Sequence, residues 1–408
     1  MNKHPDSADR DAAALLSPLA GDPAGPSRID VAGAMAEGRR RRRTRWWTSG
    51  IAVVAATATT AAGGTLAFSA LGRPTTPPPR PIVNASPSIA VAAPPAGPKD
   101  CTVSRLPTDG FEKALVTGGD PSGRWHVGRL YPPGRAQQRP LVLWRDGKIV
   151  SKVLFDGGDD SLTDVNSRGV AVGSGFDPDI SPYVYSDGKA RTLAGGEGAA
   201  SAINDAGVVV GSLGPLYEGV PARWPSTTAK PQRLPLPAGA EAGEAGDIDE
   251  AGNVLGTITP KGKEGTGYLW LADGTTRRMP LPEVDGRKAD MFWPAAIRDG
   301  WVVGRAVFDT ADSRSFAYFR YRIASNRYER LVNGAGMPAR VAANGWVVGE
   351  AERPVITVGT RNTKLPAYSK LKGEHDYIVE SISDDGLVVA GYSAGPDTAN
   401  HPLLWRCR

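Results

Sequence analysis

The sequence of 408 residues predicts an all-β fold: a seven-bladed β-propeller of four-stranded blades over residues 99–408. Three observations predict it. One short motif occurs seven times, with its copies about 44 residues apart on average. This spacing is typical of propeller blades or solenoid repeats. The high content of Gly and Pro suits many short strands joined by turns. Residues 99–408 show no sustained 3.6-residue periodicity, which argues against a helical repeat.

Residues 1–45 are expected to form a cytoplasmic tail that is disordered or contains one short helix. Ser27 and Asp30 have the spacing of a helix-capping box. Basic clusters next to a membrane bind the anionic lipid of the cytoplasmic leaflet, so membrane lipid is an expected partner. The cluster in this tail consists of Arg39, Arg40, Arg41, Arg42, Arg43 and Arg45.

Residues 46–72 are expected to form one transmembrane helix. The stretch 51–71 carries no charge over 21 residues, and about 20 apolar residues cross the hydrocarbon core. Trp46 and Trp47 precede it, and basic residues stay on the cytoplasmic side, so the N-terminus is predicted inside and the C-terminal domain outside the cell. A cleaved signal peptide is the alternative, although its apolar region is usually only about 7–15 residues long.

Residues 73–98 form a Pro-rich linker with nine prolines in 26 positions. Such a composition cannot build a core and favours the extended polyproline II conformation. At about 3.1 Å per residue, the linker could hold the next domain roughly 80 Å from the membrane.

Each repeat unit contains the parts of one blade. In "INDAGVVVG", residues 203–211, the polar residues before Gly favour a tight hairpin turn, and the apolar run suits a strand covered on both faces. The final Gly lets neighbouring backbones approach closely. An aromatic strand such as "LVLW" and a fourth strand such as "PQRLPL" follow, which gives four strands per unit. The other copies end at Gly128, Gly173, Gly256, Gly304, Gly349 and Gly391.

This pattern resembles the HAF-repeat family, which is named for a "HAF-x-W" strand followed by "IN-x-x-G-x-VVG". The resemblance covers about residues 105–405, where the second half of the motif is well kept and the first half is reduced to "RPLVLW", "VPARWP" and "NHPLLW". It implies a β-propeller-like domain outside the cytoplasm and no defined activity. The tail and span resemble those of membrane proteins from GC-rich Gram-positive bacteria.

The ring is predicted to close by pairing of its two ends. The last unit ends at "HPLLWRCR" and lacks a fourth strand, whereas "CTVSRLP", residues 101–107, resembles a fourth strand and precedes the first unit. We therefore expect residues 101–107 to complete the last blade. Cys101 and Cys407 would then lie side by side and form a disulfide in an oxidising compartment; two free thiols are the alternative.

The distribution of charge argues against nucleic-acid binding. Residues 1–98 hold 11 of the 48 basic and 6 of the 43 acidic side chains, which leaves 37 of each sign in residues 99–408. The propeller thus has no basic excess to bind phosphates.

No catalytic, cofactor or metal site is predicted. "GYSAG", residues 391–395, matches the G-x-S-x-G pattern, but Pro396 follows at once and too little chain remains for a hydrolase sheet. "DIDEAGN", which starts at Asp247, resembles a calcium loop but has Ala251 and Ile258 where ligands are needed. The acidic stretches near Asp156 and Asp177 are typical of solvated loops.

The function expected from these features is binding or scaffolding by a propeller displayed at the bacterial cell envelope, with an unknown envelope protein or glycan as its ligand. Candidate ligand contacts are the aromatic residues of irregular insertions: Tyr131, Tyr217, Phe292 and Trp293. Packing within a blade is the alternative for each of them. An extracytoplasmic hydrolase of glycan or peptide is the alternative, because carboxylates of different blades can converge without any sequence spacing. A sensor that signals through the tail is a third candidate.

Overall fold

The computed structural model describes residues 97–134, 139–155, 159–176, 179–371, 376–395 and 400–408. The expected tail, transmembrane helix and all but the last two residues of the linker lie outside this range. Within the described residues, no helix is long and apolar enough to cross a membrane.

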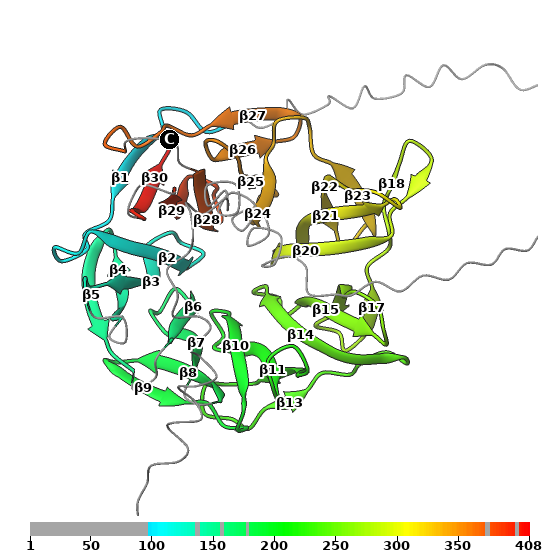
Figure 1. Ribbon diagram of the computed structural model, residues 1–408, viewed down its shortest axis with the longest axis horizontal. Coiled ribbons are helices and arrows are strands. Elements are labelled where there is room, and N and C mark those ends of the chain that lie inside the picture. The colour runs from blue at the N-terminus through cyan, green and yellow to red at the C-terminus, as the bar shows by residue number, and fades with distance from the viewer. Residues whose placement is uncertain (1–96, 135–138, 156–158, 177–178, 372–375, 396–399) are drawn as a thin grey trace, which may run out of the picture. The chain divides into compact units, whose positions relative to one another are not determined.

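Seven four-stranded antiparallel sheets are arranged around one axis, which confirms the predicted seven-bladed propeller (Figure 1). Blade 1 comprises β2 (Lys113–Gly119), β3 (Trp125–Tyr131), β4 (Leu141–Arg145) and β5 (Lys148–Val153). Blade 2 comprises β6 (Ser161–Val165), β7 (Ala171–Phe176), β8 (Ile180–Ser186) and β9 (Lys189–Thr192). Blade 3 comprises β10 (Gly198–Ile203), β11 (Val209–Leu213), β12 (Val220–Trp224) and β13 (Gln232–Arg233). Blades 4 and 5 comprise β14 (Ala240–Ile248), β15 (Val254–Pro260), β16 (Thr266–Trp270) and β17 (Thr276–Arg278); and β20 (Met291–Arg298), β21 (Trp301–Asp309), β22 (Arg314–Arg322) and β23 (Arg327–Arg330). Blades 6 and 7 comprise β24 (Met337–Val341), β25 (Val347–Glu350), β26 (Val355–Val358) and β27 (Arg361–Lys364); and β28 (Asp376–Ile382), β29 (Val388–Ala394), β30 (Pro402–Arg406) and β1 (Thr102–Arg105).

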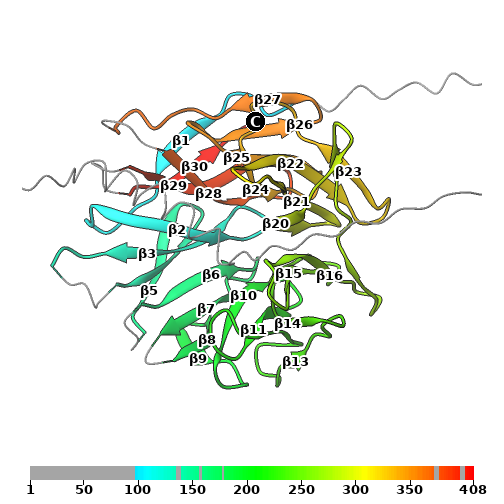
Figure 2. The same cartoon turned by 45° about the vertical axis from the view of Figure 1, so that its right-hand side comes forward.

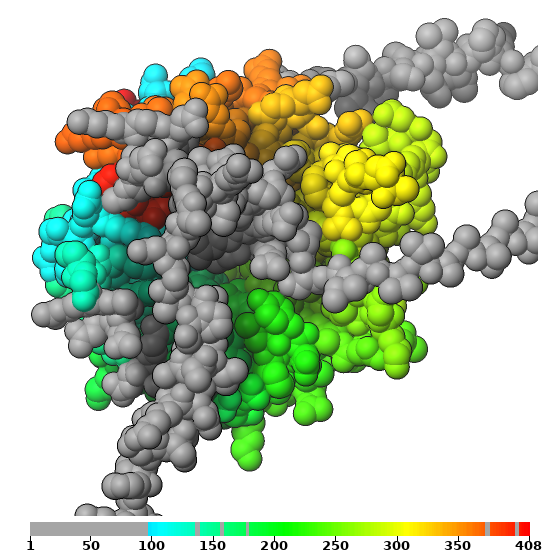
Figure 3. All heavy atoms as spheres, in the orientation of Figure 1, coloured from blue at the N-terminus to red at the C-terminus, as the bar shows by residue number. Residues whose placement is uncertain are grey.

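The first strand of each blade lies innermost, and the following strands step outward in chain order (Figures 1 and 2). A short hairpin of β18 (Glu283–Val284) and β19 (Arg287–Lys288) is inserted between blades 4 and 5. In the space-filling view, the parts drawn in colour follow one another around the molecule in chain order (Figure 3). Because successive strands of a blade run antiparallel, one face of the ring carries the connections between blades and those between second and third strands. We call it the loop face. The opposite face carries the turns between first and second strands, and we call it the turn face.

The ring closes as predicted. β1 pairs antiparallel with β30, with Thr102 opposite Arg406, and thereby becomes the outermost strand of blade 7. Cys101 and Cys407 form a disulfide with a Cα–Cα distance of 4.0 Å. The ladder continues past the disulfide, where Lys99 and Arg408 exchange backbone hydrogen bonds of 2.8 and 2.9 Å. A covalent bond thus seals the junction at which the first and last strands meet.

Tryptophans of the third strands fill the space between blades. Trp144, Trp224 and Trp405 are fully buried. Each indole N–H donates to a backbone carbonyl in the connection that precedes the first strand of its blade, for example from Trp144 to Pro107 at 2.8 Å and from Trp405 to Pro366 at 2.9 Å. This hydrogen bond satisfies the one polar group of a large apolar side chain, so the ring can be buried without cost to the indole N–H.

The repeated glycine lies opposite a β-bulge. Every innermost strand contains an irregularity in its pairing with the second strand, and the motif glycine pairs with the residue just before the extra one, as Gly211 does with Ala200. A Cβ at Gly211 would lie 1.9 Å from the carbonyl oxygen of Ala199. The glycine is therefore required by the close backbone approach at the bulge, as its place in the motif predicts.

The polar start of the motif closes the turns and joins neighbouring blades. The side-chain oxygen of Asn204 accepts the backbone N–H of Val208 at 3.0 Å, and its amide donates to the carbonyl oxygen of Asp249 in the next blade at 3.3 Å. Asn166 makes the matching bond to the carbonyl oxygen of Asn204 at 3.1 Å. The "IN" of the motif thus links successive turns on the turn face.

Candidate functional site

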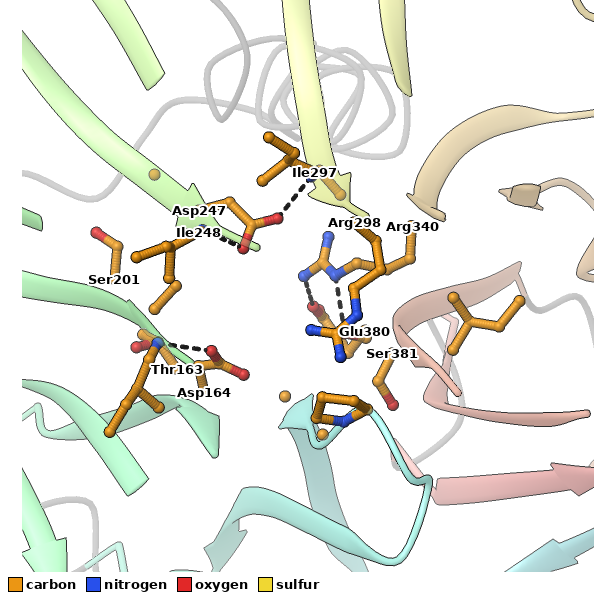
Figure 4. A pocket seen from close by; sticks show the side chains of 18 of the residues that line it. Thr163, Asp164, Ser201, Asp247, Ile248, Ile297, Arg298, Arg340, Glu380 and Ser381 are labelled. Atoms are coloured by element: carbon orange, nitrogen blue, oxygen red, sulfur yellow. Dashed lines mark hydrogen bonds and ion pairs between the residues drawn. The ribbon is translucent and has the colours of Figure 1, made fainter. Parts of the chain in front are cut away.

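The innermost strands of all seven blades surround a central cavity (Figure 4). Its volume is about 130 Å³, which is room for roughly four water molecules at about 30 Å³ each. Ligand pockets for larger molecules usually measure about 300–1,000 Å³. The cavity therefore suits water or a small polar group better than a sugar or peptide segment.

Charged side chains lie on two sides of the cavity. Asp164 and Asp247 lie on one side, and Arg298, Arg340 and Glu380 lie on the other (Figure 4). Four of these five residues stand at the bulges, where Glu380 is the extra residue and Asp164, Asp247 and Arg340 each follow it. A bulge redirects a side chain, and here it turns charged side chains toward the axis.

The two aspartates hold neighbouring blades together. Asp164 Oδ2 accepts the backbone N–H of Ile203 in blade 3 at 2.9 Å, and Asp247 Oδ2 accepts that of Ile297 in blade 5 at 2.8 Å. Burial inside the ring raises the pKa of Asp164 to about 7 and also raises the pKa of Asp247, because it disfavours the ionised carboxylate. The backbone hydrogen bonds only partly oppose this effect.

The arginines on the other side are ion-paired. Arg340 donates to the carbonyl oxygen and the carboxylate of Glu380 at 2.9 and 3.0 Å. Arg298 binds both carboxylate oxygens of Asp384 at 2.6 and 3.0 Å and also contacts Glu250 at 3.1 Å. Burial raises the pKa of Glu380 to about 7, and the neighbouring Arg340 guanidinium opposes the shift. These pairs connect blade 6 to blade 7, and blade 5 to blades 4 and 7.

The main contacts of the charged cavity side chains hold the blades together. Each charged group described above already binds a backbone group or an opposite charge of a neighbouring blade. Among the described residues, no three His, Cys, Asp or Glu side chains are placed to hold a metal ion. Ser393 of the "GYSAG" stretch lies fully buried within β29, where its Oγ accepts the backbone N–H of His401 at 3.0 Å.

The four aromatic residues predicted as ligand contacts have different surroundings. Tyr217 is 78% exposed on the β11–β12 loop. Tyr131 is partly buried, and Lys113 Nζ lies 4.6 Å from its ring centroid. Trp293 is partly buried, and its indole N–H donates to the carbonyl oxygen of Gly265 at 3.1 Å. Phe292 is wrong as a surface contact, because its side chain is fully buried in the core between blades 4 and 5.

Exposed apolar side chains gather on the loop face. Of the six large apolar residues with the highest exposure in the described part of the chain, only Val150 lies elsewhere, on the outer strand β5. The other five lie in or beside inter-blade connections and second-to-third-strand loops: Leu154, Phe176, Leu216, Tyr217 and Phe316. The loop face is therefore the better candidate for contact with another molecule.

Blade 5 adds a stack of aromatic and guanidinium groups to this face. The Arg305 guanidinium lies 4.8 Å from the Trp293 ring centroid and 5.0 Å from that of Phe316. Arg314 lies over Trp293 at 5.2 Å and pairs with Asp309 and Glu264. Cation–π contacts of this kind hold the half-exposed Phe316 ring in one orientation.

Comparison with known proteins supports the fold alone. No protein-family model and no curated protein matches the chain. The β-propeller domain of the Trilobed protease from Pyrococcus furiosus, which has an open velcro topology, superposes with a TM-score of 0.50 at 10% identity, over 72% of this chain and 94% of that one. The chain has the β-propeller fold. YCF48 bound to a D1 peptide (TM-score 0.45, 16% identity, 77% and 99% covered) and the WD40 propeller domain of Doa1 (0.44, 14%, 74% and 96%) are more distant.

Proposed function

We propose that the protein is a binding module of the cell envelope: a membrane-anchored propeller, outside the cytoplasm, that holds another envelope component on its loop face. One observation carries the proposal. Five of the six most exposed large apolar side chains among the described residues lie on that face, and the sixth, Val150, lies on an outer strand. A face that carries most of the exposed large apolar side chains is the better candidate for an interaction surface.

The proposed location has two supports. Cys101 and Cys407 are bonded in the structure, and such bonds persist mainly in oxidising compartments outside the cytoplasm. The uncharged stretch 51–71, preceded by the basic cluster, has the length and flanks of a membrane anchor. Membrane-impermeant thiol and amine reagents, applied to intact cells after reduction of the disulfide with an impermeant reductant, would test the orientation: Cys101 and Cys407 should be labelled and the N-terminus should not.

Binding to the loop face is tested with two variants of the full-length chain. Phe176→Ser combined with Phe316→Ser removes two exposed rings of blades 2 and 5, whereas Val150→Ser removes an apolar side chain of similar exposure from the outer edge. We expect the double variant to lose at least about tenfold in capture of its partner from solubilised envelope. The Val150 variant is expected to bind like the wild type. Equal capture by all three proteins would refute binding through this face.

A hydrolase is the second candidate, and one observation favours it. Asp164, Asp247 and Glu380 face the same cavity, and burial raises the pKa of each. A protonated and an ionised carboxyl group facing each other are what glycoside hydrolysis requires. Against it stand the small cavity and the backbone N–H groups that already bind both aspartates. Hydrolysis of envelope glycans that disappears in Asp164→Asn and Asp247→Asn would favour this candidate.

A further inference from the structure

The backbone of Tyr217 adopts a conformation that its side chain disfavours. Its φ angle is 69°, in the left-handed region. Every other non-glycine residue with positive φ in the described part of the chain is Asp or Asn, which tolerate this region. Tyr217 is the third residue of a turn in which the N–H of Glu218 donates to the carbonyl oxygen of Pro215 at 3.1 Å. Turns with positive φ at this position normally have Gly there.

Packing does not account for this strain. The Tyr217 side chain is 78% exposed and the neighbouring Leu216 side chain 48%. The Tyr217 hydroxyl makes no hydrogen bond with any described residue. Strained residues usually persist where function needs them. A bulky aromatic group at a glycine position, directed away from the core, is a group held out for contact with another molecule.

The base of the loop is fixed, so the tip is presented in a defined orientation. The N–H of Gly214 donates to the carbonyl oxygen of Glu197 at 2.8 Å, and Gly219 accepts from the N–H of Gly243 in blade 4 at 3.0 Å. An ordered loop loses little conformational entropy on binding, and an aromatic side chain adds a large contact area with few rotatable bonds.

The charges around the tip indicate the kind of partner. Glu218 follows Tyr217 directly, and Glu197 lies in the connection hydrogen-bonded to the loop base; both are exposed. Neither residues 213–220 nor residues 195–199 contain a Lys or Arg. An acidic rim around an apolar tip complements an apolar pocket with a basic rim. An anionic membrane surface would be repelled by the same carboxylates.

We propose that Leu216 and Tyr217 form an anchor that inserts into an apolar pocket of a partner protein whose rim carries Lys or Arg. The inference rests on the proposed function, because it names the partner class and the contact residues of the same loop face.

The test uses the full-length chain in the cells that produce it, with the photoreactive residue benzoylphenylalanine placed at Tyr217, at Phe316 or at Val150. We expect a single protein adduct at position 217 and none at position 150. Charge reversal by Glu197→Lys with Glu218→Lys should lower the adduct yield about tenfold, because the like charges of the rims would then face each other. The partner, identified from the adduct and purified, should bind the wild type more weakly as the salt concentration rises, because salt screens the attraction between the two rims.

Other outcomes would overturn the inference in distinguishable ways. An adduct at 316 without one at 217 leaves the proposed function intact and refutes the anchor. No adduct at either position counts against both. An adduct with a second copy of this chain, with lipid or with glycan alone refutes the partner class. A yield unchanged by charge reversal refutes the basic rim.

Tyr217→Gly separates an anchor from a structural residue. Glycine relieves the strain at φ 69°, so the melting temperature should stay equal or rise by about 1–3 °C. Affinity for the cross-linked partner should fall about 30-fold or more, as for a hot-spot residue. Tyr217→Trp should keep most of the affinity. A lower melting temperature in the Gly variant, or unchanged affinity, would show that Tyr217 is not an anchor.

Discussion

At the scale of single residues, the motif glycine has one physical reason. Gly211→Ala would place a Cβ 1.9 Å from the carbonyl oxygen of Ala199, so the bulge would have to shift. We expect a loss of about 1–3 kcal/mol of unfolding free energy, the usual cost of an overpacked site. Gly246→Ala is the matched control, because its nearest contact would be at 3.9 Å. Thermal or chemical denaturation of both variants measures the difference; equal stability would contradict the bulge argument.

Asp164 gives a prediction about pH. Its pKa is raised to about 7 in the folded protein and is about 3.9 when unfolded. Between these values the folded state binds more protons than the unfolded state, so the contribution of Asp164 to stability falls as the pH rises from about 4 to 7. Asp247 and Glu380 shift in the same direction.

Asp164→Asn is therefore expected to lessen the decline of the melting temperature between pH 5 and pH 7.5, in melts recorded side by side with the wild type. The same substitution at exposed Asp187 on the β8–β9 turn is the control and should leave the slope unchanged. A wild-type melting temperature that rises across this range, with the same slope in Asp164→Asn, would disprove the assignment.

At the scale of elements, β1 is the strand on which the ring depends most. It reaches blade 7 from the opposite end of the chain, and the bond between Cys101 and Cys407 closes a loop with a sequence separation of 306. Cys101→Ser with Cys407→Ser should cost about 2–4 kcal/mol, because the unfolded chain gains freedom. Denaturation curves of the double variant and of the reduced wild type should coincide. A double variant as stable as the oxidised protein would contradict this.

The repeat predicts the strands because each copy contains local signals: a polar turn, an apolar run, and a glycine where two backbones approach closely. Closure was also predictable, since the missing fourth strand and the unpaired cysteines stood at the two ends. The cavity residues were missed, because a bulge changes which side chains face the axis. Asp164, Asp247 and Arg340 nevertheless share a signal, since each stands nine residues before a motif glycine.

Phe292 was assigned to the surface for a related reason. Neighbouring residues of a strand face opposite sides, so Trp293 could be partly exposed only if Phe292 entered the core. The sequence indicates the insertion that contains both residues but not its strand β20, so it does not show which of the two side chains faces the core. Exposure of Tyr217 needed no such knowledge, because its loop lies between two glycines.

At the scale of the whole molecule, the turn face carries a belt of contacts from blade to blade. The N–H of Ser167 donates to Asp205 in blade 3, and the N–H of Asp205 donates to Glu250 in blade 4, at 2.8 and 2.9 Å. Arg298 of blade 5 joins Glu250 to Asp384 of blade 7, which lies 86 residues further along the chain.

Arg298→Met tests whether this belt holds the ring together. The Arg298 side chain is only 15% exposed and reaches past blade 6, so its loss should loosen turns in three blades at once. Hydrogen exchange should rise in residues 249–253, 298–301 and 384–388, while the outer strands stay unchanged. Arg322→Met is the matched control, because Arg322 contacts Asp299 within blade 5 alone, at 4.0 Å. Faster exchange confined to blade 5 in both variants would mean that the blades are held by their packed cores alone.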